Sequence, residues 1–319
     1  MKLQPIIPFE PIKTDTIPVG ADWISQVKWD GIRLLTYYDG KTVKLLNRKL
    51  KERTCHYPEL LDIAAYCKAD SVILDGEVIA LGSDGKPSFS MVMKRDGIRR
   101  LQKVNSVRKS IPIAYMIFDI VYCDGRWINS KTLSERLKQL DEIIIPSSSV
   151  QVVPSFSDSK KLFDVIKAQR MEGIVIKDLN SPYYINGKND RWQKKKNYQD
   201  LHAIVAGATL RSGIVNSFLL GLYDHDDSLI YIGHAGTGKL TQIERRHLTE
   251  QIRRIAIPES PFKNKPERTD GSIWLQPLLT VKVTFLEWLP SGRLRQPIVQ
   301  AFVQVPPSEC RIDGKEKRM

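Results

Sequence analysis

Short apolar runs separated by polar turns make up the first part of the chain, and this pattern predicts β-strands. Asp39-Gly40 has the composition of a tight hairpin turn between two of these runs. Helices are predicted at Ser134–Ile145, which carries an apolar stripe, and at about Asp158–Arg170. The predicted strands are Trp23–Lys28, Ile32–Tyr38, Thr42–Leu46, Ser71–Leu81 with an interruption at Asp75-Gly76, Ile111–Tyr122, Gly173–Lys177 and Arg191–Lys196.

Beyond about Asp200 the pattern changes to short strands around a single helix. The helix is Thr241–Ala256, which Thr241 and Glu244 open in capping-box spacing. The strands are His202–Leu210, Phe218–Tyr223, Leu229–Gly233 and Leu279–Trp288. Several strands and one helix in such a short segment predict a small closed barrel, for which the OB-fold is the best match. We therefore expect domains at 1–200 and 201–310, followed by a polar, frayed tail at 311–319.

Composition adds a bias toward a polyanionic partner. The 319 residues include 49 Lys+Arg and 36 Asp+Glu, for a net charge of +13. Such a charge favours phosphate contacts with nucleic acid, although a basic surface also serves solubility. The cysteines, Cys55, Cys67, Cys123 and Cys310, form no C-x-x-C pair, which argues against a zinc site or a disulfide framework. The sequence shows no membrane-spanning run and no signal peptide, so we expect a cytoplasmic protein that does not bind membranes.

The hexapeptide Lys28-Trp29-Asp30-Gly31-Ile32-Arg33 places a lysine amine beside groups that can bind a nucleotide. By itself it could equally be a solvated lysine before a tight Asp-Gly turn. Further charged and aromatic residues follow in order along the predicted strands. They occur in Leu46-Asn47-Arg48, Leu74-Asp75-Gly76-Glu77, Phe118-Asp119-Ile120, the run Glu172 to Lys177, and Trp192-Gln193-Lys194-Lys195-Lys196.

This ordered set resembles the covalent nucleotidyltransferase superfamily and, within it, the ATP-dependent DNA ligases. The likeness is greatest to the compact bacterial and phage type and to the ligase module of bacterial end-joining ligases. It covers about residues 5–300. The resemblance implies an α+β fold, with a nucleotidyltransferase adenylation domain of ATP-grasp-like antiparallel sheets followed by an OB-fold β-barrel. It also implies ATP as cofactor, Mg²⁺ with Mn²⁺ as the alternative, a nicked duplex DNA substrate, and a monomer.

The resemblance assigns the catalytic role to Lys28, whose neutral amine would attack the α-phosphorus of ATP. An exposed lysine titrates near about 10.4, so a nucleophilic lysine needs nearby cations or desolvation. The residues implied to bind the nucleotide are Gln26, Arg33, Arg48, Glu77, Phe118, Lys177, Arg191, Lys194 and Lys196. Glu172, and with it Glu77, would bind the metal.

Within that set each residue has its own implied role. Glu77 and Arg33 would lie at the ribose, and Phe118 would stack on adenine. Sequence alone leaves open that Phe118 is an ordinary core residue. Lys194 and Lys196 share one face of a strand, so both can reach a single phosphate while Lys195 points away. Lys177 would belong to the same phosphate-binding group, and Arg48 would contact a phosphate of AMP or of the nicked strand.

A basic stretch at 94–109 is interpreted as a contact to the duplex backbone, although a solvated loop is an alternative. The residues expected to contact DNA are Lys94, Arg95, Arg99, Arg100 and Lys103, together with Arg293 and Arg295 of the barrel. Gly236-Thr237-Gly238 and the segment from Glu287-Trp288 to Arg295 also resemble the ligase family, the latter most closely its bacterial end-joining type.

The chain departs from the family pattern at two places. Gln26 stands where the family usually has a glutamate thought to read the adenine amino group, so the preference for ATP over GTP is open. The closing R-x-D-K motif is absent after Phe302, where the chain reads Val303-Gln304-Val305-Pro306. Another cation could replace it, namely Arg293, Arg295, Lys315 or Lys317, or self-adenylation could be slow.

The same lysine motif leaves alternatives open. An RNA ligase or an mRNA-capping guanylyltransferase would share it, although the strand containing Lys194 and Lys196 and the segment ending at Arg295 favour a DNA ligase. A catalytically inactive DNA-binding homologue is the alternative of another class, and only the missing closing motif supports it. The sequence does not identify a biological pathway or protein partners such as end-joining proteins.

Overall fold

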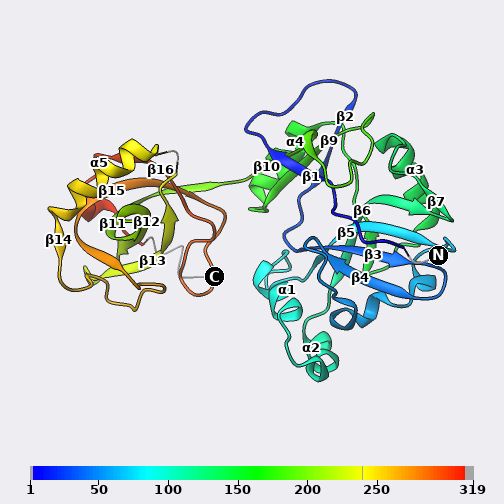
Figure 1. The fold of residues 1–319 in the computed structure, drawn as a ribbon, viewed down its shortest axis with the longest axis horizontal. Helices are drawn as coiled ribbons and strands as arrows, with labels where there is room; N and C mark the ends of the chain where they lie inside the picture. Colours follow the sequence, from blue (N-terminus) through cyan, green and yellow to red (C-terminus); the bar gives the residue numbers. More distant parts are fainter. Residues whose placement is uncertain (1–2, 239, 313–319) are drawn as a thin grey trace. The chain divides into compact units, whose positions relative to one another are not determined.

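The computed structural model describes residues 3–238 and 240–312, and the chain divides into two compact units, Met1–Asn197 and Tyr198–Met319 (Figure 1). The tail prediction for 313–319, and with it Lys315 and Lys317, lies outside the described residues. No helix in the described part of the chain is long and apolar enough to cross a membrane.

Two sheets form the first unit. The smaller one has the order β1 (Glu10–Lys13), β10 (Lys188–Lys196), β9 (Gly173–Asp178) and β2 (Trp23–Val27). The larger one has the order β4 (Val43–Asn47), β3 (Ile32–Tyr38), β5 (Val72–Ile79), β6 (Ala114–Cys123) and β7 (Arg126–Trp127), and β8 (Val150–Val152) pairs with β6. All pairings are antiparallel except β1–β10 and β6–β8.

Helices cover the outer faces of these sheets. On the smaller sheet, α4 (Ser159–Ala168) packs its apolar side, Leu162 and Ile166, against Ile174 and Ile176 of β9. The larger sheet shares a core with α1 (Phe89–Asp96), α2 (Val104–Ser110) and α3 (Leu133–Ile143). Alternate residues of β9 are therefore buried against α4, which leaves its other face for polar chemistry.

The three predicted helices are confirmed as α3, α4 and α5 (Gln242–Arg253). Thr132 Oγ1 accepts a hydrogen bond from Glu135 N, and the Glu135 carboxylate accepts one from Thr132 N, which completes a capping box at the start of α3. Asp158 caps α4 through Lys161 N. The sequence pattern did not predict α1 and α2, because both helices are short and the segment 89–110 is dense in basic residues.

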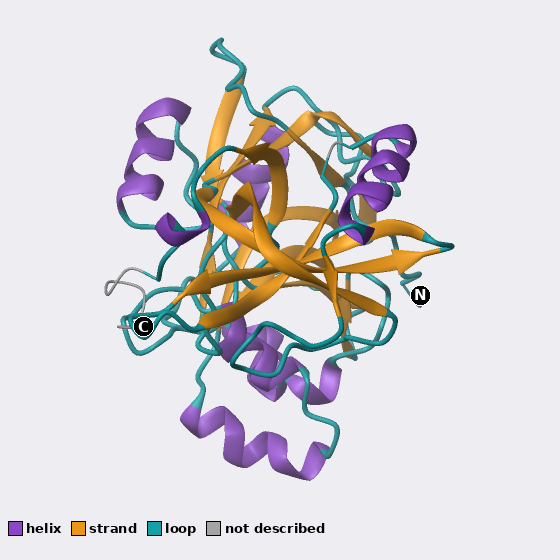
Figure 2. Cartoon of the chain, turned by 90° about the vertical axis from the view of Figure 1, so that its left-hand side faces the viewer, coloured by secondary structure: helices purple, strands orange, loops and turns teal. Residues whose placement is uncertain are grey.

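The second unit is a closed barrel. Its strands are β11 (Gln199–Arg211), β12 (Ile214–Tyr223), β13 (Leu229–Gly236), β15 (Ser272–Phe285) and β16 (Ile298–Val303), with the short β14 (Ala256–Ile257) at the side. They follow the order β11-β12-β13-β16-β15, and the β11–β15 pairing closes the ring. Its strands are strongly curved (Figure 2).

The single helix of the barrel, α5 (Gln242–Arg253), lies between the third and fourth strands along the chain and begins with the predicted capping box of Thr241. Apolar side chains such as Phe218, Leu219 and Val281 fill the interior. This strand order and helix position are those of an OB-fold, so the predicted fold class is confirmed.

Candidate functional site

One face of the smaller sheet gathers the predicted site residues. Lys177 of β9 lies opposite Ile24 of β2 and Trp192 of β10, and Val175 lies opposite Gln26 and Lys194. Since side chains alternate along a strand, the face that carries Lys177 also carries Gln26, Lys28, Val175, Trp192, Lys194 and Lys196. Lys195 points to the other face, where its ammonium lies 5.1 Å from the ring centroid of Phe163 in α4.

At the end of this face, Glu172 holds two lysines. Its Oε2 accepts a hydrogen bond from Lys28 Nζ at 2.6 Å, and its Oε1 lies 3.1 Å from Lys196 Nζ. Burial of Glu172 opposes its ionisation, but the charges of Lys28 and Lys196 outweigh that effect and lower its pKa. The pKa of Lys194 is also lowered, by burial first and then by the positive charges of Lys28 and Lys196. The amines therefore form a dense positive cluster that suits a phosphate.

The turn that carries Lys28 is shaped by a glycine. β2 ends at Val27 and β3 begins at Ile32, so Lys28 to Gly31 connect the two sheets. A Cβ built on Gly31 would lie 2.1 Å from the carbonyl oxygen of Val78, a distance that no side chain tolerates. Glycine thus lets the turn lie directly against β5 and brings Lys28 close to the larger sheet.

The larger sheet contributes a buried ionic network. Arg33 grips Asp75 with two hydrogen bonds, Nε to Oδ1 at 2.9 Å and Nη2 to Oδ2 at 2.5 Å, and Tyr183 also donates to Asp75. Glu77 on β5 lies directly opposite Arg33 on β3 in the strand register. Burial raises the pKa of Glu77 to about 8, although the positive charges of Lys28 and Arg33 act in the opposite direction.

Phe118 stands at a break in the β5–β6 register. Asp75 pairs with Asp119 and Gly76 pairs with Ile117, so Phe118 has no partner residue on β5. Such a bulge re-aims a side chain. The prediction that Asp75-Gly76 interrupts the strand with a turn is wrong, because β5 runs unbroken from Val72 to Ile79 and the irregularity is a bulge instead.

Phe118 packs against a small apolar cluster of the buried side chains Ile79, Met116 and Val153. Gln26 borders it: its Nε2 donates to Val153 O at 3.3 Å and to Ser155 Oγ at 3.1 Å. Its buried Oε1 has no hydrogen-bond partner among the described residues. A buried unpaired acceptor is costly, so this oxygen is suited to a ligand that brings a hydrogen-bond donor.

Some predicted residues are engaged elsewhere. Lys177 is buried and donates to Phe118 O, so its amine does not face the basic cluster of Lys28, Lys194 and Lys196. Arg48 pairs with Glu10 at 3.4 Å, and Arg191 pairs with Asp178. Asp119 supports its strand through a fully buried pair with Arg136.

The residues predicted to contact DNA divide into two groups. Arg95 is fully buried and donates to Ile111 O, His56 O and Glu59, so it stabilises the fold and is not available to a duplex. The other cations of α1, α2 and the segment between them are exposed: Lys94, Arg99, Arg100, Lys103, Arg108 and Lys109. In the barrel, Arg293 pairs with Glu267, and the buried Arg295 pairs with Glu287 at 2.9 Å.

Sequence reasoning missed several contributors. In sequence, Asp75-Gly76 looks like a turn, and Tyr183 gives no signal because it lies in a loop after β9. Val175, partly exposed between Gln26 and Lys194, looks in sequence like any apolar strand residue. Strand alternation counted from Lys177 could have placed Val175 on the site face.

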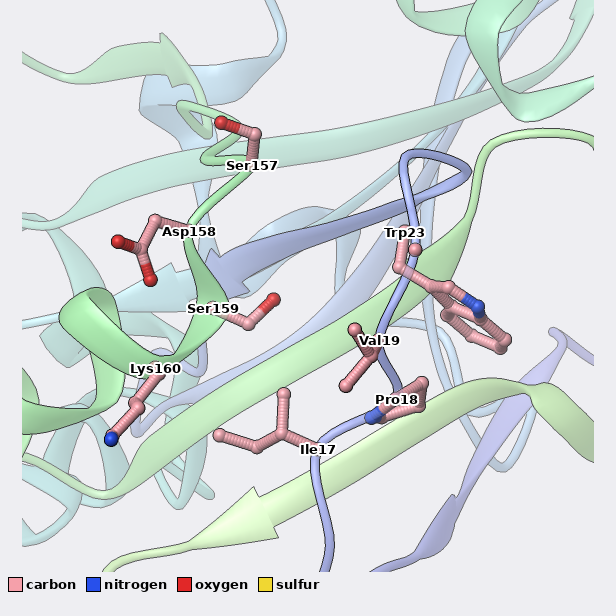
Figure 3. A pocket seen from close by; sticks show the side chains of 9 residues that line it. Ile17, Pro18, Val19, Trp23, Ser157, Asp158, Ser159 and Lys160 are labelled. Atoms are coloured by element: carbon pink, nitrogen blue, oxygen red, sulfur yellow. The ribbon is translucent and has the colours of Figure 1, made fainter.

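A separate cavity of about 380 Å³ lies on the opposite face of the smaller sheet (Figure 3). It is lined by Ile17, Pro18, Val19, Gly20, Trp23 and the segment Ser157, Asp158, Ser159 and Lys160 at the start of α4. Trp23 alternates with Ile24 on β2, so the cavity does not open onto Lys28.

Comparison with known proteins agrees with this geometry. Residues 8–196 match the family described as ATP dependent DNA ligase domain, and residues 211–303 match the ATP dependent DNA ligase C terminal region. The chain therefore belongs to the ATP-dependent DNA ligase family, and the resemblance drawn from the motifs is confirmed.

Individual relatives support the same family. The chain is 30% identical over 284 residues to the multifunctional non-homologous end joining DNA repair protein LigD of Mycobacterium tuberculosis, a match that covers 86% of this chain and 35% of that relative. It is 35% identical over 189 residues to the SPbeta prophage-derived DNA ligase-like protein LigB of Bacillus subtilis, covering 59% of this chain and 66% of the relative. The chain thus spans about a third of the length of the first curated relatives that it matches.

A solved structure described as mycobacterial DNA ligase D complexed with ATP and MES has the same fold. It is 28% identical to this chain, with a TM-score of 0.52, and the match covers 97% of this chain and 98% of the chain of that structure.

Proposed function

We propose that this protein is an ATP-dependent DNA ligase that seals nicks in duplex DNA through a lysyl-AMP intermediate on Lys28. The observation that supports the proposal most is the cluster of Lys28, Glu172, Lys194 and Lys196. Glu77 is close enough for the charges of Lys28 and Glu172 to act on its pKa. The family and the relatives named for DNA ligation agree with it.

In the first step, Lys28 Nζ attacks the α-phosphorus of ATP. Nζ gives up a proton toward the carboxylate of Glu172. An N–P bond forms, the bond from the α-phosphorus to the bridging oxygen breaks, and pyrophosphate leaves with the bonding electrons. Lys28 donates to Glu172 at 2.6 Å, which fixes the direction of its amine. Lys194 and Lys196 are placed to neutralise the charge that develops on the phosphate oxygens.

In the following steps, a 5′-phosphate oxygen at the nick displaces Lys28 from the α-phosphorus. The adjacent 3′-hydroxyl then attacks that 5′-phosphate and expels AMP. The same basic cluster serves each displacement, because each passes through a similar phosphoryl transition state.

The adenosine moiety would occupy the larger-sheet side of the site. Its base would stack on Phe118 beside the apolar cluster, where Gln26 offers an acceptor. Glu77 and Arg33 would lie at the ribose. Arg48 and Arg191, which pair with acidic residues in this structure, are secondary candidates for phosphate contacts.

A divalent cation fits this site chemically. No group of three or more His, Cys, Asp or Glu side chains is arranged for a metal in the described part of the chain. Mg²⁺ characteristically takes only one or two carboxylates together with nucleotide phosphates and water. Glu172 and Glu77 would hold it, and a cation near Glu77 would relieve the unfavourable burial of that carboxylate. When bound, Mg²⁺, or Mn²⁺ in its place, would neutralise phosphate charge.

Duplex DNA would contact the basic surface of α1 and α2. We propose Lys94, Arg99, Arg100 and Lys103 for these contacts, with Arg293 as a contact from the barrel. Backbone contacts of this kind position a protein without reading sequence.

The decisive experiment is detection of the covalent intermediate. The protein is incubated with ATP or GTP labelled at the α-phosphate and separated on a denaturing gel, and the adduct is then offered nicked DNA or nicked RNA. We expect adduct with ATP, label transfer to nicked DNA, and sealing. Adduct from GTP alone would point to a guanylyltransferase, and no adduct would point to an inactive homologue.

Two lysine variants sharpen this test. Lys28→Ala is expected to abolish adduct and sealing. Lys195→Ala is the matched control, because Lys195 lies on the same strand as Lys194 and Lys196 but faces away from the site. Sealing that survives in Lys28→Ala would contradict the mechanism.

A further inference from the structure

Lys177 lies in a closed cage and not at the phosphate cluster. Its side chain is 1% exposed. Its Nζ lies 4.6 Å from the ring centroid of Phe118 and 4.0 Å from that of Trp192. An ammonium or amine enclosed by two aromatic rings has no direct path to a nucleotide phosphate.

The same amine satisfies the backbone at the bulge. Lys177 Nζ donates to Phe118 O at 3.2 Å. Phe118 has no partner residue on β5, so its carbonyl lies outside the regular ladder. A buried carbonyl without a donor is unfavourable, and Lys177 reaches across from the smaller sheet to supply one.

Charges from the neighbouring elements hold this arrangement in place. Asp75 of β5 and Asp119 of β6 attract the amine, whereas Arg33 of β3 and Arg136 of α3 repel it. Arg136 in turn grips Asp119 with hydrogen bonds of 2.7 and 3.0 Å, which fixes the residue next to Phe118. Burial, the largest effect, lowers the pKa of Lys177 to about 7.

Phe118 itself remains partly exposed, unlike its neighbours Ile117 and Asp119. We infer that Lys177 is a positioning residue that acts on the nucleotide through Phe118. By bonding the bulged carbonyl and packing against the ring, it presents the ring as a rigid platform for the base. This inference rests on the proposed function, in which adenine stacks on Phe118.

The test separates base binding from phosphate binding. Dissociation constants are measured for ATP and for inorganic tripolyphosphate in a Lys28→Ala background, which removes the covalent step. We expect Lys177→Met to raise the dissociation constant for ATP about tenfold, because the carbonyl and the ring lose their partner. The dissociation constant for tripolyphosphate should change by less than about twofold. Lys194→Met, the matched control, is expected to weaken the binding of both ligands.

A double variant tests whether the effect passes through Phe118. In Lys177→Met/Phe118→Leu, the loss of ATP affinity should not exceed that of Phe118→Leu alone, since two residues that act as one unit are not additive. Lys177→Arg, which keeps N–H donors and a cation, should bind ATP within about threefold of the protein with Lys177. If Lys177→Met does not fold, Lys177→Gln, which removes the cation, takes its place with the same expectation of a loss for ATP and not for tripolyphosphate.

Two results would overturn the inference: equal losses for ATP and tripolyphosphate in Lys177→Met, or additive losses in the double variant. Both measurements use equilibrium binding. An absence of adduct in the wild-type protein would therefore count against the proposed function without deciding the role of Lys177.

Discussion

Gln26 combines fixed donors with an unused acceptor. Its amide nitrogen is held by Val153 O and Ser155 Oγ, which fixes the orientation of the group and leaves Oε1 directed elsewhere. An adenine amino group is a donor that matches this oxygen, whereas the keto oxygen of guanine would face it with a second acceptor. Gln26, which stands where the family usually has a glutamate, therefore still offers a hydrogen-bond acceptor.

We predict that Gln26 selects ATP over GTP. Adduct formation by the wild-type protein should favour ATP by about tenfold or more, and Gln26→Leu should reduce that ratio, because it removes the acceptor. Gln26→Glu, which also accepts, should retain the preference. The ratio is measured from initial rates of labelled adduct. An unchanged ratio in Gln26→Leu would exclude this role.

The buried amine of Lys177 makes a prediction about stability and pH. Its pKa is lowered to about 7 in the folded protein, so between that value and the usual lysine pKa the unfolded chain binds more protons. Stability from this group therefore rises with pH across that window. From pH 7 to 9, the free energy of unfolding of the wild-type protein should rise by about 2 kcal/mol relative to Lys177→Met.

Urea unfolding at the two pH values measures this difference. Lys44→Met is the matched control, because Lys44 is an exposed lysine on β4. A Lys177→Met variant with the same pH dependence as the wild-type protein would show that the amine is not desolvated.

At the scale of elements, the sequence specifies the starts of two helices directly through their capping residues. Thr132 and Thr241 each open a helix with a glutamate three positions later, and both capping boxes are complete in the structure. These signals are local, because donor and acceptor lie within one turn. The sequence also places Lys194 and Lys196 on one face of their strand, because alternation alone decides which side chains share a face.

Removal of either cap should cost a similar amount. Thr132→Ala and Thr241→Ala are each expected to lower the free energy of unfolding by about 1 kcal/mol, because a helix N–H loses its partner. Thr132→Ser and Thr241→Ser, which keep the hydroxyl, should be nearly neutral. Urea denaturation checks this, and equal stability of the alanine and serine variants would mean that the hydroxyl does not contribute.

At the scale of the whole molecule, the net charge of +13 is spread over many elements, so charge alone does not locate a DNA surface. The structure separates buried cations from exposed ones. Arg95 and Arg136 are buried in ion pairs, whereas the exposed cations of α1, α2 and their connection are available to phosphates. Counterion release then makes the number of phosphate contacts measurable.

We predict that alanine at Lys94, Arg99, Arg100 and Lys103 together weakens nicked-duplex binding. The slope of log K against log salt should become shallower by about 3 to 4, because about four phosphate contacts are lost. A control with alanine at Lys138, Lys160, Lys161 and Lys167 changes the net charge equally, on exposed positions of α3 and α4. Equal slopes for the two variants would place the duplex elsewhere.

The sequence by itself determined what depends on neighbours along the chain: the helix caps, the strand faces, the barrel and the order of motifs around Lys28. Only the tertiary structure decided which charged residues are free to act. Arg95 and Lys177 look in sequence like other basic residues, but Glu59 and Phe118, 36 and 59 positions away, enclose them. Burial of a charge depends on the partners that the fold brings together, and the bulge at Phe118 exists only where β5 and β6 meet.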